Sequence, residues 1–273
     1  MAVQVPKHQF VNAPLTGKVA LVTGSTSGIG LASAHKLAQQ GCNVIIHGLV
    51  DQAQGKELQG LFERTYEIKS AFSDANLAEV KEIDQLFSVI QAKFGRLDIV
   101  VNNAGVQYTE TTEKFPLERW QMIININLTA AFYITQKALP LMHENNWGRI
   151  INIASVHGLV GSVNKSAYVA AKHGLVGFTK VVAMEQANRG VTVNAICPGW
   201  VETPLINDQI DAIAKHQSLS FDDAKKQLVT AKQPLENMTS PDQIGDLVSF
   251  LCSDSASTMT GSALTIDGGW TAQ

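Results

Sequence analysis

The chain has 273 residues, 45% of them hydrophobic, and a formal net charge of −3 at pH 7. That length suffices for one large domain or two small ones, and the small charge gives no electrostatic reason to expect nucleic acid or an anionic membrane as a partner. No apolar stretch approaches the roughly 20 residues of a membrane span, and the N-terminus lacks the apolar core of a signal peptide. We expect a cytoplasmic protein with a short N-terminal extension, residues 1–16, and one domain, residues 17–273.

The cysteines and histidines exclude two kinds of stabilising site. Cys42, Cys197 and Cys252 are odd in number, far apart in the sequence and not in CxxC pairs, which indicates a reducing compartment rather than a disulfide framework. The seven histidines show no metal-ligand spacing, so we predict no metal site.

Apolar β-branched runs alternate with helical patterns along almost the whole chain. Near-continuous apolar strands favour a sheet that is covered on both faces, and the alternation favours parallel strands with right-handed crossovers. We therefore predict an α/β fold, a doubly wound, mostly parallel sheet with helices on both faces. Residues 203–232 interrupt this alternation of strands and helices and are predicted to form a helical lid over the substrate. The predicted strands are 18–23, 43–48, 97–105, 149–155, 191–199 and 263–269, and the predicted helices are 28–41, 52–64, 77–93, 117–143, 167–188 and 241–252.

The first predicted strand runs into the glycine-rich sequence TGSTSGIG, residues 23–30. Gly24, Gly28 and Gly30 let the backbone turn tightly and approach a phosphate, and the following helix presents its N-terminal amides to that anion. A glycine-rich stretch alone is a weak signal, but this one lies at the first strand-to-helix turn, which is the required context. It predicts a dinucleotide cofactor.

Tyr168 and Lys172 lie four residues apart, so they share one helix face, and Ser155 precedes them at the end of a strand. A phenol has a pKa of about 10 and is a poor base at neutral pH, but a neighbouring lysine cation favours the phenolate. That combination suits a proton donor or acceptor near pH 7. Because such a pair is common on amphipathic helices, the interpretation depends on the motifs around it.

Those motifs resemble the short-chain dehydrogenase/reductase family. The glycine spacing TGxxxGxG is followed by NNAG at 102–105, Asn127 in NINL, the Ser155, Tyr168 and Lys172 set, PGWVETP at 198–204 and DGGW at 267–270. These features occur in the family's order over residues 17–273. The resemblance implies a Rossmann-type fold, oxidoreductase activity and a homotetramer in which the helices near 117–143 and 167–188 pair between subunits.

The resemblance also implies roles for single residues. Tyr168 would be the general acid/base, Lys172 would lower its pKa and bind the nicotinamide ribose, and Ser155 would orient the reacting oxygen. Asn127 would hold a water that links Lys172 to solvent, although a helix bend or a buried amide is an ordinary alternative. Cofactor contacts are implied for Tyr168 and Lys172 and for Gly24, Thr26, Gly28, Ile29, Gly30, Leu49, Asn76, Leu77, Asn103, Ala104, Gly105, Pro198, Gly199, Val201 and Thr203.

The end of the second predicted strand bears on the choice between NAD and NADP. Gly48 and Leu49 stand where family members often carry an acidic residue for NAD or a basic one for NADP. Neither signature is present, but a phosphate dianion buried beside leucine without a partner would be costly. Asn76 departs from the family's frequent aspartate near the adenine and could keep that contact in altered form. We predict NAD.

Four polar residues fall beyond the carboxyl ends of predicted strands, where open α/β sheets bind ligands. Taken singly, Gln107 and Gln209 are typical of surface amides and Lys165 of a solvated lysine, while His157 could equally be a satisfied loop histidine or a ligand-binding residue. Together they could form a carboxylate site, and they resemble the carboxylate-binding set of bacterial D-3-hydroxybutyrate dehydrogenases. The substrate-binding residues implied in this way are Gln107, Ser155, His157, Lys165, Tyr168, Gln209 and, at the apolar end of the substrate unless they only pack in the core, Trp200 and Trp270.

We therefore predict reversible, NAD-dependent interconversion of (R)-3-hydroxybutyrate and acetoacetate, a reaction of ketone-body metabolism on a small-molecule substrate. One alternative is another short-chain reductase that acts on 3-oxoacyl carriers or sugar alcohols. A second is a catalytically silent NAD-binding protein, against which the intact set of Ser155, Tyr168, Lys172 and Asn127 argues.

Overall fold

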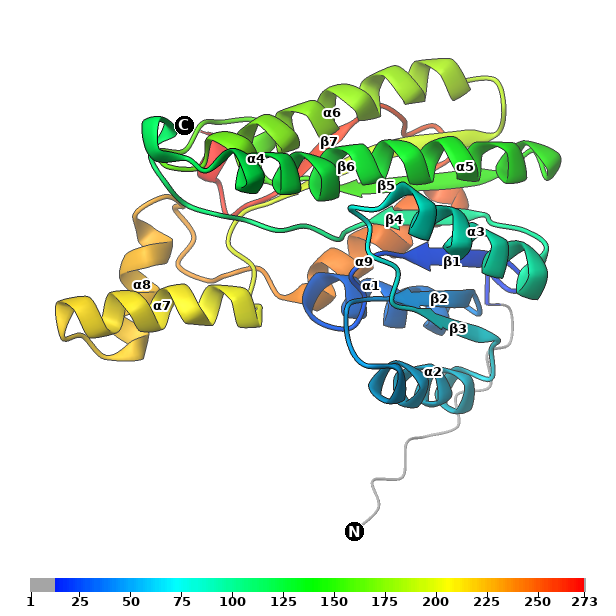
Figure 1. The fold of residues 1–273 in the computed structure, drawn as a ribbon, viewed down its shortest axis with the longest axis horizontal. Coiled ribbons are helices and arrows are strands. Elements are labelled where there is room, and N and C mark those ends of the chain that lie inside the picture. The colour runs from blue at the N-terminus through cyan, green and yellow to red at the C-terminus, as the bar shows by residue number, and fades with distance from the viewer. Residues whose placement is uncertain (1–12, 273) are drawn as a thin grey trace, which may run out of the picture.

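A computed structural model of the chain describes residues 13–272, apart from the side chains of Leu205 and Asp208. Within that part, all strands run parallel in one sheet of order β3-β2-β1-β4-β5-β6-β7. This arrangement confirms the predicted doubly wound sheet (Figure 1). The strands are β1 (Val19–Val22), β2 (Asn43–His47), β3 (Ser70–Ser73), β4 (Ile99–Asn102), β5 (Gly148–Ile153), β6 (Val191–Pro198) and β7 (Ala263–Ile266).

Helices cover both faces of the sheet. One hydrophobic cluster joins the strands to Leu37, Phe62 and Val248 of the first helical layer, and a second joins them to Leu86 and Ile134 of the opposite layer. Because both faces are covered, β1, β5 and β6 are buried at every position, and β1 is a continuous apolar run. The helices are α1 (Gly28–Gln39), α2 (Gln52–Tyr66), α3 (Val80–Phe94), α4 (Leu117–Ile124), α5 (Ala130–Glu144), α6 (Ser166–Gln186), α7 (Pro204–Gln217), α8 (Phe221–Thr230) and α9 (Pro241–Cys252).

The order of the strands reverses direction between β1 and β4. From β1 the chain builds outward through β2 and β3, and from β4 it builds the other way through β5, β6 and β7. The connections on the two sides therefore leave in opposite directions and open a crevice at the carboxyl ends of the central strands. This crevice is where the predicted site residues should gather.

Two local features differ from the sequence-based expectation. β3 was not predicted, because its four residues, SAFS, include two serines and it pairs only with β2 at the edge of the sheet. The helix predicted over 117–143 is interrupted by a π-helical turn at Asn125–Thr129 that separates α4 from α5. Such turns are frequent at functional sites.

The predicted lid is a separate pair of helices. α7 and α8 project from the main body beyond the carboxyl edge of the sheet (Figure 1). They have their own small core, formed by Ile206, Ile210, Ala224 and Val229 with Met238. A unit that packs mainly on itself can move relative to the sheet at a small cost in buried surface.

The N-terminal extension predicted for residues 1–16 lies, up to residue 12, outside the described part of the chain. Leu15 is buried in the core, and its N–H donates to the Gln40 carbonyl oxygen, so the described end of this segment is fixed to the domain. In residues 13–272, Cys42, Cys197 and Cys252 are buried free thiols. Over the same residues, no cluster of three or more acidic, histidine or cysteine side chains suits a metal ion, and none of the helices combines the length and apolarity needed to cross a membrane.

Candidate active site

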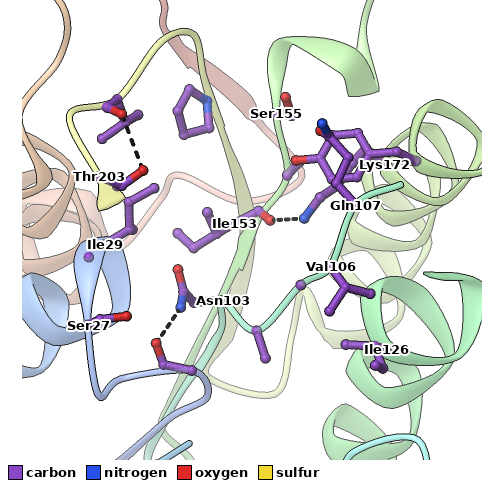
Figure 2. A pocket seen from close by; sticks show the side chains of 18 of the residues that line it. Ser27, Ile29, Asn103, Val106, Gln107, Ile126, Ile153, Ser155, Lys172 and Thr203 are labelled. Atoms are coloured by element: carbon purple, nitrogen blue, oxygen red, sulfur yellow. Dashed lines mark hydrogen bonds between the residues drawn. The ribbon is translucent and has the colours of Figure 1, made fainter. Parts of the chain in front are cut away.

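A pocket of about 560 Å³ follows the carboxyl ends of the strands. Gly24 after β1, Asn103 after β4, Ser155 after β5 and Gly199 after β6 all line it. Figure 2 shows side chains from these loops and from α6 facing one another across this space. The fold thus brings together residues that are far apart in the sequence.

Nearly all the residues predicted for the site line this single pocket. The pocket is lined by Ser155, Tyr168 and Lys172 and by all eight residues predicted to contact the substrate. It is also lined by every residue predicted to contact the cofactor except Gly30. Gly30 lies behind the glycine-rich loop against Gly24, and Asn127 lines a small neighbouring cavity. The sequence analysis missed several residues that line the pocket. Ser27, Ala75, Val106 and Ile153 could have been found because they lie within two residues of predicted ones. His47 could not, because in the sequence it is typical of a buried strand.

The glycine-rich loop has the shape that a phosphate group requires. Gly24 and Gly28 have φ angles of +63° and +53°, which side chains rarely adopt. A Cβ on Gly30 would overlap the carbonyl oxygen of Gly24. Ser27, the N-cap of α1, gives no side-chain cap, so the first-turn amides of α1 are not satisfied by its hydroxyl and can receive an anion. These residues fit the pyrophosphate of a dinucleotide.

The loop is held in place from β4. Asn103 Nδ2 donates to the carbonyl oxygens of Thr23 and Gly24, at 2.8 and 3.0 Å, and the Asn103 N–H donates to Thr23 Oγ1 at 2.9 Å. One of these side-chain bonds is visible in Figure 2. Asn103 therefore supports the cofactor loop from behind while it lines the pocket itself.

Near Leu49, where the adenosine end of a dinucleotide is predicted to lie, no described lysine or arginine lines the pocket. Leu49 is 72% exposed at the mouth of the pocket. Asn76 Oδ1 accepts from the Ala78 N–H at 3.1 Å, which leaves its amide N–H groups for a ligand. Among the side chains that the structure describes, the only lysines or arginines that line the pocket are Lys165 and Lys172. Lys165 is the N-cap of α6 and Lys172 lies within that helix, so both are at the opposite end of the pocket from Leu49.

The residues predicted to transfer the proton lie where β5 meets α6. Burial raises the pKa of Tyr168, and a hydrogen bond with Ser155 partly offsets that rise. Burial lowers the pKa of Lys172 to about 8, so its amine is mostly charged at pH 7. Lys172 Nζ donates to the Ile153 carbonyl oxygen at 2.7 Å (Figure 2) and lies 5.6 Å from the centre of the Tyr168 ring.

This arrangement differs in one respect from the expected one. The neighbour that lowers the pKa of Tyr168 here is Ser155 rather than Lys172, because the lysine ammonium is held at the Ile153 carbonyl. The effect of Lys172 on Tyr168 stays a prediction for the complex with cofactor.

Asn127 lies within the π-helical turn between α4 and α5. Its Oδ1 accepts from the Val106 N–H at 2.8 Å, and its Nδ2 donates to the Val106 carbonyl oxygen at 3.0 Å. Both ordinary alternatives for this residue, a helix bend and a buried amide, are therefore present. Asn127 anchors the segment that carries Gln107, and the water relay to Lys172 stays a prediction.

The four residues predicted to bind a carboxylate converge from separate segments. Gln107 follows β4, His157 follows β5, Lys165 precedes α6 and Gln209 lies on α7, and all line the same pocket as Tyr168. The His157 ring is 6.2 Å from that of Tyr168 between centres. Burial and the charge of Lys165 lower the pKa of His157 to about 4, so the imidazole is neutral at pH 7 and can donate only one hydrogen bond.

The electrostatics of this end of the pocket favour an anion. Burial lowers the pKa of Lys165, with no acidic neighbour to offset it. Of the side chains that the structure describes, no aspartate or glutamate lines the pocket. A half-buried cation without a protein carboxylate gains most from a ligand that brings one.

Two tryptophans wall the remaining side. The rings of Trp200 and Trp270 are 5.3 Å apart between centres, and Trp270 meets the His157 ring edge-on at 5.5 Å. Both line the pocket, so Trp270 is not confined to core packing. The two rings therefore form an aromatic wall beside His157 and Lys165, two of the residues predicted to bind a carboxylate.

Comparisons with known proteins agree with this geometry. Residues 24–271 match a family model described as Enoyl-(Acyl carrier protein) reductase. The chain is 50% identical to D-beta-hydroxybutyrate dehydrogenase of Cupriavidus necator, over 95% of this chain and all of that one. It is 43% identical to the enzyme of the same name from Rhizobium meliloti, over 94% and 99% of the two chains. L-sorbose reductase from Gluconobacter frateurii, solved with NADPH and L-sorbose, superposes with a TM-score of 0.91 at 27% identity, over 96% of this chain and 99% of that one. The chain therefore belongs to the short-chain dehydrogenase/reductase family, whose members are oxidoreductases that use a nicotinamide cofactor.

Proposed function

We propose that this protein catalyses the reversible, NAD-dependent oxidation of (R)-3-hydroxybutyrate to acetoacetate. The observation that carries the proposal is the convergence of Lys165, His157, Gln107 and Gln209 on the pocket of Tyr168, without a described acidic side chain to neutralise them. Two relatives that bear the name D-beta-hydroxybutyrate dehydrogenase, at 50% and 43% identity, support it.

Side chains of the protein transfer the hydroxyl proton of the substrate. Tyr168 takes the hydroxyl proton of the substrate, and the Ser155 hydroxyl orients the same oxygen by hydrogen bonding. Lys172, mostly charged at pH 7, stabilises the phenolate that forms and contacts the nicotinamide ribose. When bound, the nicotinamide ring supplies the acceptor for the hydride from C3.

The carboxylate-binding residues fix which face of C3 meets the cofactor. The Lys165 ammonium provides the charge, while neutral His157 and the amides of Gln107 and Gln209 each provide an uncharged donor. Because Gln209 lies on α7, closure of the lid completes the set and excludes water, which strengthens every polar contact inside. The methyl end of the substrate then lies against Trp200 and Trp270.

NAD is the proposed cofactor because the pocket offers no described cation to bind the additional 2′-phosphate of NADP. The 2′-phosphate of NADP would lie near Leu49, where no described lysine or arginine lines the pocket. The neighbouring structure with NADPH shows that the fold by itself does not select the cofactor. Kinetics with both dinucleotides test this choice, and a preference for NADP would contradict it.

We also propose a cytoplasmic homotetramer. Phe132 on α5 and Val181 and Met184 on α6 are large apolar side chains exposed on adjacent helices, as expected of a face that pairs between subunits. Light scattering of the purified protein should give four times the mass of one chain, 29.4 kDa. A monomer at micromolar concentration would contradict the assembly.

The experiment for the main proposal is a comparison of kcat/KM across substrates. (R)-3-hydroxybutyrate should exceed a 3-hydroxyacyl thioester and polyols by about 10- to 150-fold, which is the loss expected when a charge-assisted contact is missing. Its (S) enantiomer keeps the carboxylate and should react more slowly, because it presents the other face of C3 to the cofactor. If the free acid is no better than the neutral substrates, the carboxylate site is wrong and another reductase activity is favoured. Tight NAD binding without turnover of any hydroxy acid would indicate a catalytically silent NAD-binding protein.

A further inference from the structure

His47, the last residue of β2, lies beneath the glycine-rich loop with its side chain almost fully buried. Its Nδ1 accepts a hydrogen bond from the Gly24 N–H at 3.0 Å, and its Nε2 lies 2.8 Å from the Ala75 carbonyl oxygen. A backbone N–H only donates and a carbonyl oxygen only accepts, so the partners on both sides assign the neutral Nε2–H tautomer. The imidazole therefore bridges two backbone groups in one protonation state only.

The backbone of His47 binds the same loop a second time. The His47 N–H donates to Ser25 Oγ at 2.9 Å, and the Ser25 N–H donates to the His47 carbonyl oxygen at 2.7 Å. Ala75 directly precedes Asn76 in the turn after β3. One residue thus joins the loop after β1, the end of β2 and the turn after β3, and Gly24, His47 and Ala75 all line the cofactor end of the pocket.

We propose that neutral His47 is a positioning residue for the dinucleotide cofactor, and that its protonation releases the Gly24 amide and weakens cofactor binding in acid. A second proton on Nδ1 would set one N–H against another across the 3.0 Å contact with Gly24. It would also place a charge in a site that water does not reach. The proposal depends on the dinucleotide site but not on the identity of the hydroxy acid.

The surroundings of the imidazole decide the direction of its titration. Burial is the main influence and lowers the pKa of His47, while the charge of Asp74 and the bond to Ala75 act in the opposite direction. Asp74 is the only charged group that acts on it among the described residues. The other polar neighbours are the backbone of Gly24 and Ala75 and the hydroxyl of Ser25. Because the pKa of His47 is lowered, binding should weaken only at pH values below the ordinary histidine pKa of about 6.5.

Two substitutions separate the roles of hydrogen bonding and charge. His47→Asn keeps an oxygen that can accept from the Gly24 N–H but cannot be protonated in this range. His47→Leu removes the acceptor and leaves the amide buried without a partner. His35→Asn is a matched control, because burial also lowers the pKa of His35 but its Nδ1 contacts the Tyr66 hydroxyl at 2.8 Å on the outer side of α1 and it does not line the pocket.

The test is the dissociation constant of NAD, measured by calorimetry at about pH 5.5 and about pH 7, since Lys172 is mostly charged at both values. The wild type and His35→Asn should both lose NAD affinity at the lower pH, to the same extent. His47→Asn should bind within about threefold of wild type at the higher pH and lose the acid effect. His47→Leu should bind about tenfold more weakly at both, as expected for one unsatisfied amide, while kcat at saturating NAD stays within about twofold.

Three results would overturn the proposal. The first is an acid effect that persists in His47→Asn, and the second is unchanged NAD affinity in His47→Leu. The third is a His47 variant that lowers kcat but leaves the dissociation constant of NAD unchanged. Because the readout is binding, failure of 3-hydroxybutyrate as a substrate leaves this test intact. A wild-type protein that binds neither NAD nor NADP would overturn both this inference and the proposed cofactor site.

Discussion

Replacing Lys165 with alanine removes the positive charge on which the proposed substrate preference depends. Lys165 lines the pocket and has no acidic neighbour that acts on its pKa. Burial lowers the pKa of Lys165, and a substrate carboxylate beside the amine would favour its charged form. The substitution should therefore raise the KM for (R)-3-hydroxybutyrate and leave NAD binding unchanged.

The size of the effect follows from the setting of the charge. Two unit charges about 4 Å apart near a protein surface attract each other by about 4 kcal/mol at an effective dielectric constant of about 20. Desolvation of both groups offsets part of this, and a charge-assisted hydrogen bond contributes about 1.5–3 kcal/mol net. We therefore expect kcat/KM for the acid to fall about 10- to 150-fold, mainly through KM.

The assay is steady-state kinetics with the free acid and with its uncharged methyl ester. The acid should lose its advantage in Lys165→Ala, while kcat/KM for the ester changes by less than about threefold, because the ester makes no charged contact. Lys81→Ala, at an exposed position on α3, is the matched control and should behave as wild type. A large loss of NAD affinity with an unchanged KM for the acid would refute the role assigned to Lys165.

Three further predictions concern the chemistry, the cofactor loop and acid stability. Tyr168→Phe should lower kcat by about 10²- to 10⁴-fold while NAD affinity, followed by fluorescence, changes less than about threefold; an active variant would exclude Tyr168 as the acid/base. Gly30→Ala should weaken NAD binding at least about tenfold, because the new Cβ overlaps the Gly24 carbonyl oxygen; unchanged binding in calorimetry would show that the loop adapts. Because the pKa of His157 falls to about 4 in the folded protein, the unfolded chain binds more protons between about pH 6.5 and pH 4. The free energy of unfolding in urea should therefore decrease as pH falls through that window, and less so in His157→Gln; an equal decrease in both would contradict this.

The fold was predictable because its main signals are local. Continuous apolar strands, helical periodicity and the glycine-rich turn each follow from short stretches of sequence. Strand β3 could not be predicted from the sequence, because its stability comes from pairing with β2 rather than from its own four residues. The π-helical turn at Asn125–Thr129 was also missed, because five residues between two helices are too few to show a period of their own.

The site was predictable where the residues form spaced motifs. Ser155, Tyr168 and Lys172 belong to one run, and the structure places all three in the pocket. Gln209 could be included only through the family resemblance, because it reaches the pocket from the lid. His47 gave no signal, since its importance depends on bonds to Gly24 and Ala75, which are distant in sequence and come together only in the fold.

The central claim is that a short hydroxy acid binds with its carboxylate among Lys165, His157, Gln107 and Gln209. A crystal structure with NAD and acetoacetate tests it most directly. We expect the carboxylate within hydrogen-bonding distance of Lys165 Nζ and the His157 ring, about 2.7–3.2 Å, and the keto oxygen at the hydroxyls of Tyr168 and Ser155. An acetoacetate carboxylate that points to solvent, or away from Lys165, would contradict the account.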